Sequence, residues 1–167
     1  IQEDDERPWF CMINLYDVHW PYVPTRGSRA AFVQSYDGPL DGYLFRSDNW
    51  QPGYEPDGAD KRHMLDLYDA ELVDLDLVVD GFLAQLGFEE GGTAMLLTSD
   101  HGEAFGEAGK WKHEDIYEPQ VQVPLIVRLP DAKPAGRRSK LAATGIDVAP
   151  ILLGLAGLVA YASGVEW

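Results

Sequence analysis

Long apolar runs and cysteine are the two features that this 167-residue sequence most clearly lacks. No stretch reaches the about 18 consecutive apolar residues of a membrane-spanning helix, so the sequence predicts no transmembrane segment. Cys11 is the one cysteine, which excludes a disulfide bond within the chain. It stands inside the apolar run 9–13, and we therefore expect a buried, unreactive thiol.

Basic residues are also scarce. The chain has 13 Lys and Arg against 28 Asp and Glu, which gives a formal net charge of −15. Such a charge argues against a nucleic-acid partner, because the phosphate backbone would be repelled. It fits either the acidic surface of a salt-adapted protein or the binding of divalent cations. The apolar share of 46% is high enough for a folded domain with a core.

Three common catalytic signatures are missing. The sequence has no Gly-x-Ser-x-Gly elbow, no phosphate-binding P-loop and no Gly-rich dinucleotide fingerprint. The segment GEAFG at residues 102–106 contains no serine. The residues alone therefore predict no attacking group.

The stretch 93–130 carries the clearest chemical signal that is present. The short apolar run 93–98 follows two glycines and predicts a buried strand, which ends in Ser99, Asp100, His101 and Gly102. A second buried strand is predicted at 123–127. In open α/β sheets, ligands bind at the carboxyl ends of the strands, and Asp with neutral His suits a divalent cation. The alternative is that Asp100 only caps a turn.

Two further places carry groups suited to an anion. Lys112 and His113 follow the Asp100–His101 pair by about ten residues, and His19 follows another predicted strand at 8–16. A cation beside a lysine and one or two histidines forms a trap for a tetrahedral oxyanion such as sulfate or phosphate. We therefore expect His19 to share a site with Asp100.

A long helix is predicted at 61–86 by an apolar stripe with steps of three and four residues. Its members are Leu65, Tyr68, Leu72, Leu75, Val79, Phe82 and Leu86. Asp60 is the expected N-cap and Gly87 the expected end. This helix is expected to connect the strand at 8–16 to the strand at 93–98 as a right-handed βαβ unit. The preceding segment 25–60 reads as a long loop with one weak helix at 29–36, and a short apolar helix is expected at 146–157.

The chain resembles the sulfatase family of the alkaline phosphatase superfamily. The matching segments occur in the family's order: DVHWPY at 17–22, YDAE at 68–71, TSDHGE at 98–103, KH at 112–113 with YE at 117–118, VPLIV at 123–127 and IDVAP at 146–150. The resemblance implies an α/β fold, a segment of an alkaline phosphatase-like sandwich with a mixed, mostly parallel sheet flanked by helices. It implies a single partial domain over residues 1–167, truncated at both ends.

The same resemblance assigns roles to residues. It implies that Asp100 and His101 bind a divalent cation, usually calcium, with manganese as the alternative. It implies that His19 contacts the sulfate or protonates the leaving group, and that Lys112 holds a sulfate oxygen. The interval from Lys112 to Tyr117 is one residue longer than in the usual form, so His113 is the alternative to Lys112. The expected substrate is a small-molecule or carbohydrate sulfate ester.

The chain departs from the family in two respects. Members carry Cys-x-Pro-x-Arg or Ser-x-Pro-x-Arg, whose first residue becomes the formylglycine nucleophile, whereas Cys11 is followed by Met-Ile-Asn. Formylglycine is thus expected only in an N-terminal part outside this sequence. Many sulfatases have Asn where His101 stands, and His occurs there in relatives that hydrolyse phosphate or phosphonate esters. A phosphoesterase or phosphonate monoester hydrolase, and a non-catalytic binding module, remain the alternatives to a metal-dependent sulfatase.

Overall fold

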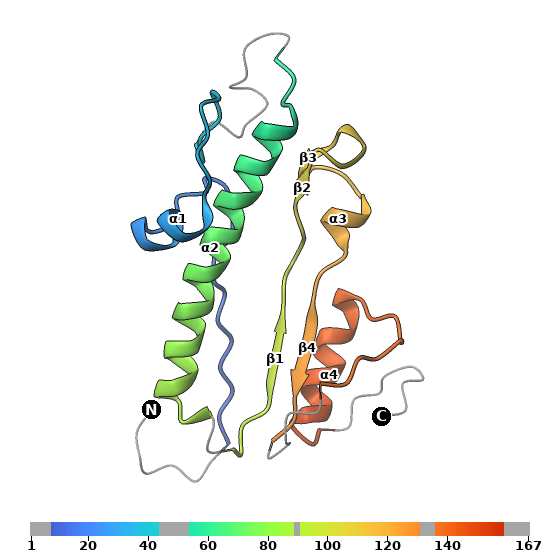
Figure 1. The fold of residues 1–167 in the computed structure, drawn as a ribbon. Coiled ribbons are helices and arrows are strands. Elements are labelled where there is room, and N and C mark those ends of the chain that lie inside the picture. Colours follow the sequence, from blue (N-terminus) through green and yellow to red (C-terminus); the bar gives the residue numbers. More distant parts are fainter. Residues whose placement is uncertain (1–7, 44–53, 89–90, 131–135, 159–167) are drawn as a thin grey trace. The chain divides into compact units, whose positions relative to one another are not determined.

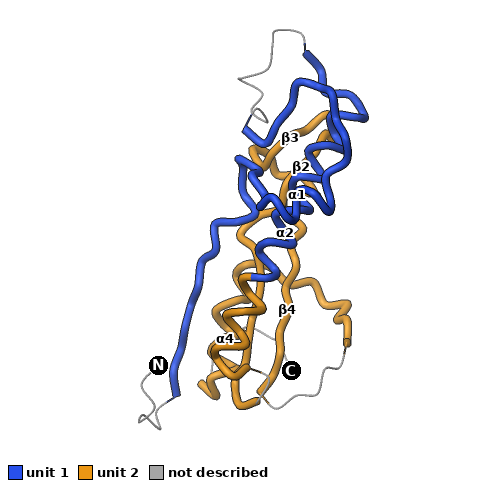
Figure 2. Tube along the Cα trace, turned by 60° about the vertical axis from the view of Figure 1, so that its left-hand side comes forward, with its two compact units in different colours: residues 1–77 blue, residues 78–167 orange. Residues whose placement is uncertain are grey.

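The computed structural model describes residues 8–43, 54–88, 91–130 and 136–158. The chain divides into two compact units, Ile1–Leu77 and Val78–Trp167, which Figure 2 shows in blue and orange. The boundary falls inside the long helix α2, Gly58–Gln85, which Figure 1 labels. No helix in the described ranges is both long and apolar enough to cross a membrane.

The first unit packs around the N-terminal part of α2. It contains α1, Arg26–Phe32, which begins where the Thr25 hydroxyl oxygen accepts a hydrogen bond from the Ser28 amide. The predicted weak helix at 29–36 is therefore present but starts three residues earlier. Among the first unit's described residues, the buried apolar side chains are Tyr22, Leu40, Met64, Leu67 and Ala70.

Helix α2, Gly58–Gln85, confirms the long helix that the periodicity predicts. Asp60 is not its N-cap: the Asp57 carboxylate accepts hydrogen bonds from the amides of Ala59 (2.7 Å) and Asp60 (3.0 Å), so Asp57 caps the helix. Asp60 lies in the first turn, where its carboxylate binds tyrosine hydroxyls instead. The helix ends as expected, with Gly87 in the left-handed region at φ 64°.

The buried face of α2 differs from the predicted stripe. Met64, Leu67 and Glu71 are buried, whereas Leu72 of the predicted stripe is 42% exposed. A shift of one residue turns a helix by about 100°. Apolar side chains occupy more than one face of this helix, so periodicity alone does not select the face that the first unit covers.

The described part of the second unit contains two short sheets, whose strands are labelled in Figure 1. Strand β1, Met95–Thr98, pairs with β4, Leu125–Arg128, and β2, Ala104–Phe105, pairs with β3, Trp111–Lys112. Between them lie η3, Glu107–Gly109, and α3, Glu118–Val121. After β4 come η4, Gly145–Asp147, and α4, Val148–Leu155, in place of the predicted helix at 146–157. Among the described residues of this unit, the buried apolar ones are Phe88, Ala104, Phe105 and Ile151.

The prediction of a mostly parallel sheet is wrong for the described residues. Both strand pairs are antiparallel, and Met95 lies opposite Arg128 while Thr98 lies opposite Leu125. No helical crossover carries the chain forward after β1; instead β2, β3 and α3 turn it back, so β4 returns in the opposite direction. Strands β1 and β4 are confirmed as elements, but they are only partly buried.

Residues 8–16 form no strand, so the expected βαβ unit is not formed with them. The segment is exposed, and Phe10 and Met12 are 72% and 82% exposed. Cys11 is exposed with it, contrary to the expectation of a buried thiol. Within the described part of the chain, no residues bury this apolar run.

Candidate functional site

Strand β1 ends where the predicted cation-binding residues begin. The turn after it is closed by the Ser99 hydroxyl, which donates to the carbonyl of His101 at 2.7 Å, and by the His101 amide, which donates to Asp100 Oδ1 at 3.0 Å. The side chains of Asp100 and His101 are 89% and 38% exposed. Both side chains therefore remain accessible to a ligand from solvent.

The geometry of the Asp100–His101 pair fits a divalent cation. His101 Nδ1 lies 2.9 Å from the carbonyl oxygen of Gly102, which can only accept, so Nδ1 carries the proton and neutral His101 has its lone pair on Nε2. A backbone carbonyl that holds the second ring nitrogen in this way is typical of metal-binding histidines. Nε2 lies 3.9 Å from Asp100 Oδ2. Two donor atoms at that separation could each lie about 2.4 Å from one cation.

This pair is not a complete site. In the described ranges no group of three or more His, Cys, Asp or Glu side chains is arranged to hold a metal ion. Calcium takes about six to eight oxygen ligands, so a cation held here would keep most of its water or take ligands from elsewhere.

Lys112 begins the opposite side of the candidate site. It is the last residue of β3 and has φ 62°, a left-handed conformation that costs roughly 1–2 kcal/mol for a residue with a side chain. Its side chain is only 16% exposed, and Nζ lies 3.5 Å from Glu114 Oε1. The strained backbone at Lys112 turns the chain and places His113 next to the β1 turn.

His113 meets His101 directly. The two rings stack with centroids 4.0 Å apart and planes tilted by 27°. His113 Nδ1 lies 3.2 Å and 3.4 Å from the two carboxylate oxygens of Glu103, whose side chain is 6% exposed. The structure thus brings His113 and His101 together, and a buried carboxylate fixes the orientation of the His113 ring. The sequence analysis assigned no role to Glu103, although this acidic residue stands two positions after His101 in the matching segment 98–103.

Gln120 is the second residue that the sequence analysis missed. Its side chain is fully buried, Nε2 donates to the Lys112 carbonyl at 2.8 Å, and Oε1 accepts from the Asp115 amide at 3.0 Å. Its own carbonyl accepts from the Gly102 amide at 2.8 Å. A Cβ on Gly102 would lie 2.2 Å from the Pro119 carbonyl oxygen, so only glycine allows this approach. Helix α3 is therefore bonded both to the Asp100–Gly102 turn and to the Lys112–Asp115 turn.

His19 lies in the first unit. Its Nδ1 is 2.6 Å from the Trp20 carbonyl oxygen, so neutral His19 also has its lone pair on Nε2, and the Tyr16 ring lies 4.6 Å from it between centroids. The expectation that His19 and Asp100 share one site stays a prediction.

The segment after His19 is fastened to α2 by two carboxylates. Glu71 accepts a hydrogen bond from the Val23 amide, and Asp74 accepts from the Thr25 amide at 2.6 Å. Burial, with a smaller contribution from the charge of Asp17, raises the pKa of Glu71 to about 7. Its Oε2 atom is buried and has no hydrogen-bond partner in the described part of the chain. Glu71 thus holds the His19 segment with a carboxyl group that is easily protonated.

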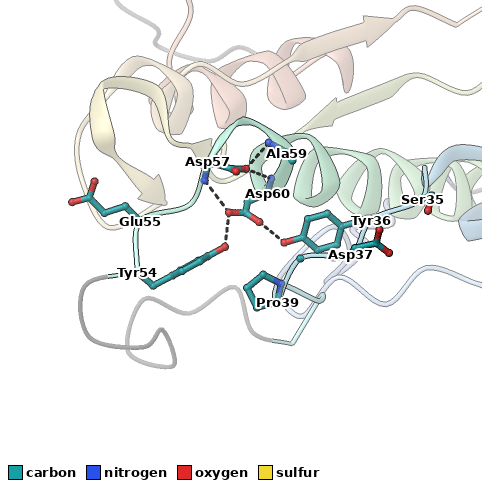
Figure 3. Close-up of a pocket in the computed structure, with 10 residues that line it drawn as sticks. Ser35, Tyr36, Asp37, Pro39, Tyr54, Glu55, Asp57, Ala59 and Asp60 are labelled. Carbon is teal, nitrogen blue, oxygen red and sulfur yellow. Dashed lines mark hydrogen bonds between the residues drawn. The ribbon is translucent and has the colours of Figure 1, made fainter.

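A cavity of about 450 Å³ lies elsewhere in the first unit. Figure 3 shows Asp60 at its wall, with the hydroxyls of Tyr36 and Tyr54 and the Asp57 amide all directed at its carboxylate. Burial alone would raise the pKa of Asp60, but these hydrogen bonds outweigh it and lower the pKa. Both carboxylate oxygens of Asp60 already accept hydrogen bonds, so its role here is structural: it links Tyr36 and Tyr54 to the first turn of α2.

Comparisons with known proteins agree with the sequence resemblance. The family model described as Sulfatase matches residues 1–158. The chain is 36% identical over 77 residues to N-acetylglucosamine-6-O-sulfatase of Bacteroides thetaiotaomicron, covering 46% of this chain and 14% of that protein. It is 27% identical over 178 residues to choline-sulfatase of Rhizobium meliloti, covering 94% and 33%.

A third relative carries a different name. The chain is 32% identical over 139 residues to the low-salt glycan biosynthesis sulfotransferase Agl7 of Haloferax volcanii, covering 77% of this chain and 34% of that protein. No solved structure is significantly similar to the chain. The chain spans at most 34% of the length of these three relatives. Since the family model matches nearly the whole chain, the protein belongs to the sulfatase family, whose fold is of the α/β alkaline phosphatase type.

Proposed function

We propose that this chain supplies the cation-binding and oxyanion-binding part of a sulfuric ester hydrolase site. Membership of the sulfatase family supports this reaction class. The observation that carries the proposal is the stacking of His101 on His113, with ring centroids 4.0 Å apart. This contact brings the Asp100–His101 pair next to the Lys112 turn within one unit. A site for a metal-bound anion needs its cation-binding and anion-binding residues close together.

Each residue has a defined part in the proposal. A divalent cation, calcium or manganese, would be held by Asp100 Oδ2 and His101 Nε2 and would polarise the sulfate oxygens as a Lewis acid. The Lys112 ammonium group, or in its place the His113 ring, binds a sulfate oxygen and orients the ester. His19 contacts the sulfate or, when its ring is protonated on Nε2 as well as on Nδ1, donates the Nε2 proton to the leaving alkoxide or phenoxide.

The attacking group is assigned to sequence outside these 167 residues. The chain contains neither Cys-x-Pro-x-Arg nor Ser-x-Pro-x-Arg, and Cys11 is followed by Met-Ile-Asn. The expected attacking group is a formylglycine in an N-terminal part outside this sequence, and not Cys11. The names of two relatives, an N-acetylglucosamine-6-O-sulfatase and a choline-sulfatase, support a carbohydrate or small-molecule sulfate ester as substrate.

Sulfuryl transfer is the second candidate reaction, because one relative is named a glycan biosynthesis sulfotransferase. The two reactions share the anion and differ in the acceptor, which is water in hydrolysis and a sugar hydroxyl in transfer. A donor aryl sulfate offered with and without a soluble hexosamine separates them: sulfated sugar in the products indicates transfer, and free sulfate indicates hydrolysis.

The decisive experiment uses the full-length protein that contains this chain. Chromogenic aryl sulfate and aryl phosphate are assayed with added Ca²⁺ or Mn²⁺ and after treatment with EDTA. We expect Asp100→Asn to lose metal and activity together, because a neutral amide compensates less of the cation's charge. Lys112→Ala should keep its metal and lose turnover, because the lysine contacts the oxyanion.

Asp80→Asn is the matched control, since it removes one exposed carboxylate from α2 and should change neither metal content nor turnover. Loss of metal in Lys112→Ala would reverse the assignment of roles. Faster hydrolysis of the aryl phosphate than of the aryl sulfate would replace the sulfatase by a phosphoesterase.

A further inference from the structure

We propose that Gln120 is a positioning residue that holds the Lys112–Asp115 turn in register with the Asp100–Gly102 turn. This inference rests on the proposed function, since it explains how the cation pair and the oxyanion-binding residues are kept at a fixed separation. Nothing in the sequence resemblance points to Gln120.

The first argument is the bonding of the Gln120 carboxamide. Both of its ends bind backbone groups of one turn: Nε2 donates to the Lys112 carbonyl at 2.8 Å, and Oε1 accepts from the Asp115 amide at 3.0 Å. Lys112 and Asp115 flank His113, so the carboxamide clamps the turn on both sides of that histidine. Because Gln120 is only 2% exposed, water cannot readily take over these bonds.

The second argument is the attachment of Gln120 to the other turn. Its backbone carbonyl accepts from the Gly102 amide at 2.8 Å, one residue after His101. The absence of a Cβ on Gly102 lets the Pro119 carbonyl come close enough for this bond. Gln120 therefore binds the Asp100–Gly102 turn through its main chain and the Lys112–Asp115 turn through its side chain.

The third argument is the backbone of Lys112. This residue has φ 62°, a conformation that a lysine does not keep without support. The hydrogen bond to its carbonyl from Gln120 is such support. If the carboxamide were removed, the turn would relax towards ordinary backbone angles, and His113 and Lys112 would move away from His101.

The test compares Gln120→Met and Gln120→Glu in the full-length protein. Methionine has a similar length and volume but loses both hydrogen bonds, whereas glutamate keeps the acceptor for the Asp115 amide and loses the donor to the Lys112 carbonyl. Gln122→Met makes the same chemical change at an exposed position two residues away. Ile151→Ala, in the buried part of α4, controls for general destabilisation of the second unit.

Two measurements are made at a temperature at which all variants are folded. Hydrogen–deuterium exchange should increase in the peptides that cover residues 112–116 for Gln120→Met, less so for Gln120→Glu, and not for either control. Turnover of the aryl sulfate should fall roughly 10- to 100-fold for Gln120→Met, since a displacement of about 1 Å suffices for this. Metal content should stay at the wild-type level, because Asp100 and His101 keep their own turn.

Unchanged exchange at residues 112–116 in Gln120→Met would overturn the proposal, as would an equal loss of turnover in Ile151→Ala. Exchange does not depend on which ester is hydrolysed. If the wild-type protein cleaves no sulfate ester, the proposed function fails, and the exchange pattern alone decides whether Gln120 holds the turn.

Discussion

Gly102→Ala tests the contact on which the candidate site depends. The Cβ of an alanine at this position would lie 2.2 Å from the Pro119 carbonyl oxygen and 3.2 Å from its carbon. Non-bonded carbon and oxygen atoms need about 3.2 Å or more, so the two backbones must separate by roughly 1 Å. The bond from the Gly102 amide to the Gln120 carbonyl is 2.8 Å long and would then exceed the range of a normal hydrogen bond.

The expected cost follows from these two effects. Forcing an extra methyl group into a tightly packed contact typically costs about 1–3 kcal/mol, and a buried hydrogen bond contributes about 1 kcal/mol. Gly102→Ala should therefore lower the free energy of unfolding by roughly 2–4 kcal/mol. It should also lower metal affinity, because the Gly102 carbonyl that holds His101 Nδ1 moves with the backbone.

Urea denaturation and metal titration of the purified protein measure both effects. Gly145→Ala is the control, since a Cβ there meets nothing within 4 Å and the residue has no positive φ. Its stability should stay within about 0.5 kcal/mol of wild type. A Gly102→Ala variant that is as stable as Gly145→Ala and binds metal normally would refute the close packing of α3 against the Asp100–Gly102 turn.

Three further predictions concern the helix and the charge of the chain. Burial raises the pKa of Glu71 from 4.5 to about 7, so the folded state holds this proton more tightly than the unfolded state does. The free energy of unfolding should therefore fall by at most about 3 kcal/mol as the pH rises from 4.5 to about 7. Denaturation curves at several pH values should show this fall in the wild type and not in Glu71→Gln. Gly81→Ala, at an exposed position inside α2 with no atom within 4 Å of the added Cβ, should stabilise the protein by about 0.5–1 kcal/mol, and an unchanged thermal midpoint would contradict this. Because the formal net charge is −15, the thermal midpoint should rise as KCl screens the repulsion, and a midpoint independent of salt would contradict a role for the charge.

Local signals in the sequence predicted the long helix and two of the strands, but they also predicted a strand at 8–16 that does not form. The periodicity at 61–86 located α2, Gly87 marked its end, and the apolar runs located β1 and β4. These features depend on residues that are close together in the sequence, so they can be predicted from a single sequence. The capping of α2 by Asp57 instead of Asp60 shows the limit, because two suitable acidic residues lie three positions apart and only the path of the loop selects between them.

Long-range features were not predictable in the same way. The direction of β4 depends on how β2, β3 and α3 fold the chain back, which no strand pattern contains. The role of Gln120 depends on three backbone groups from two other turns, and a single glutamine in the sequence gives no signal of this. His101 and His113 were both singled out, but their stacking became visible only in three dimensions.

His19 and His101 share a feature whose consequence extends beyond this chain. Each ring has its Nδ1 atom within 2.9 Å of the carbonyl oxygen of the very next residue, Trp20 or Gly102. A contact between sequence neighbours forms without the help of distant parts of the fold. Which nitrogen of each imidazole carries its hydrogen is thus set by the backbone directly after the histidine, so a change in a distant loop that leaves this backbone in place also leaves the lone pair on Nε2.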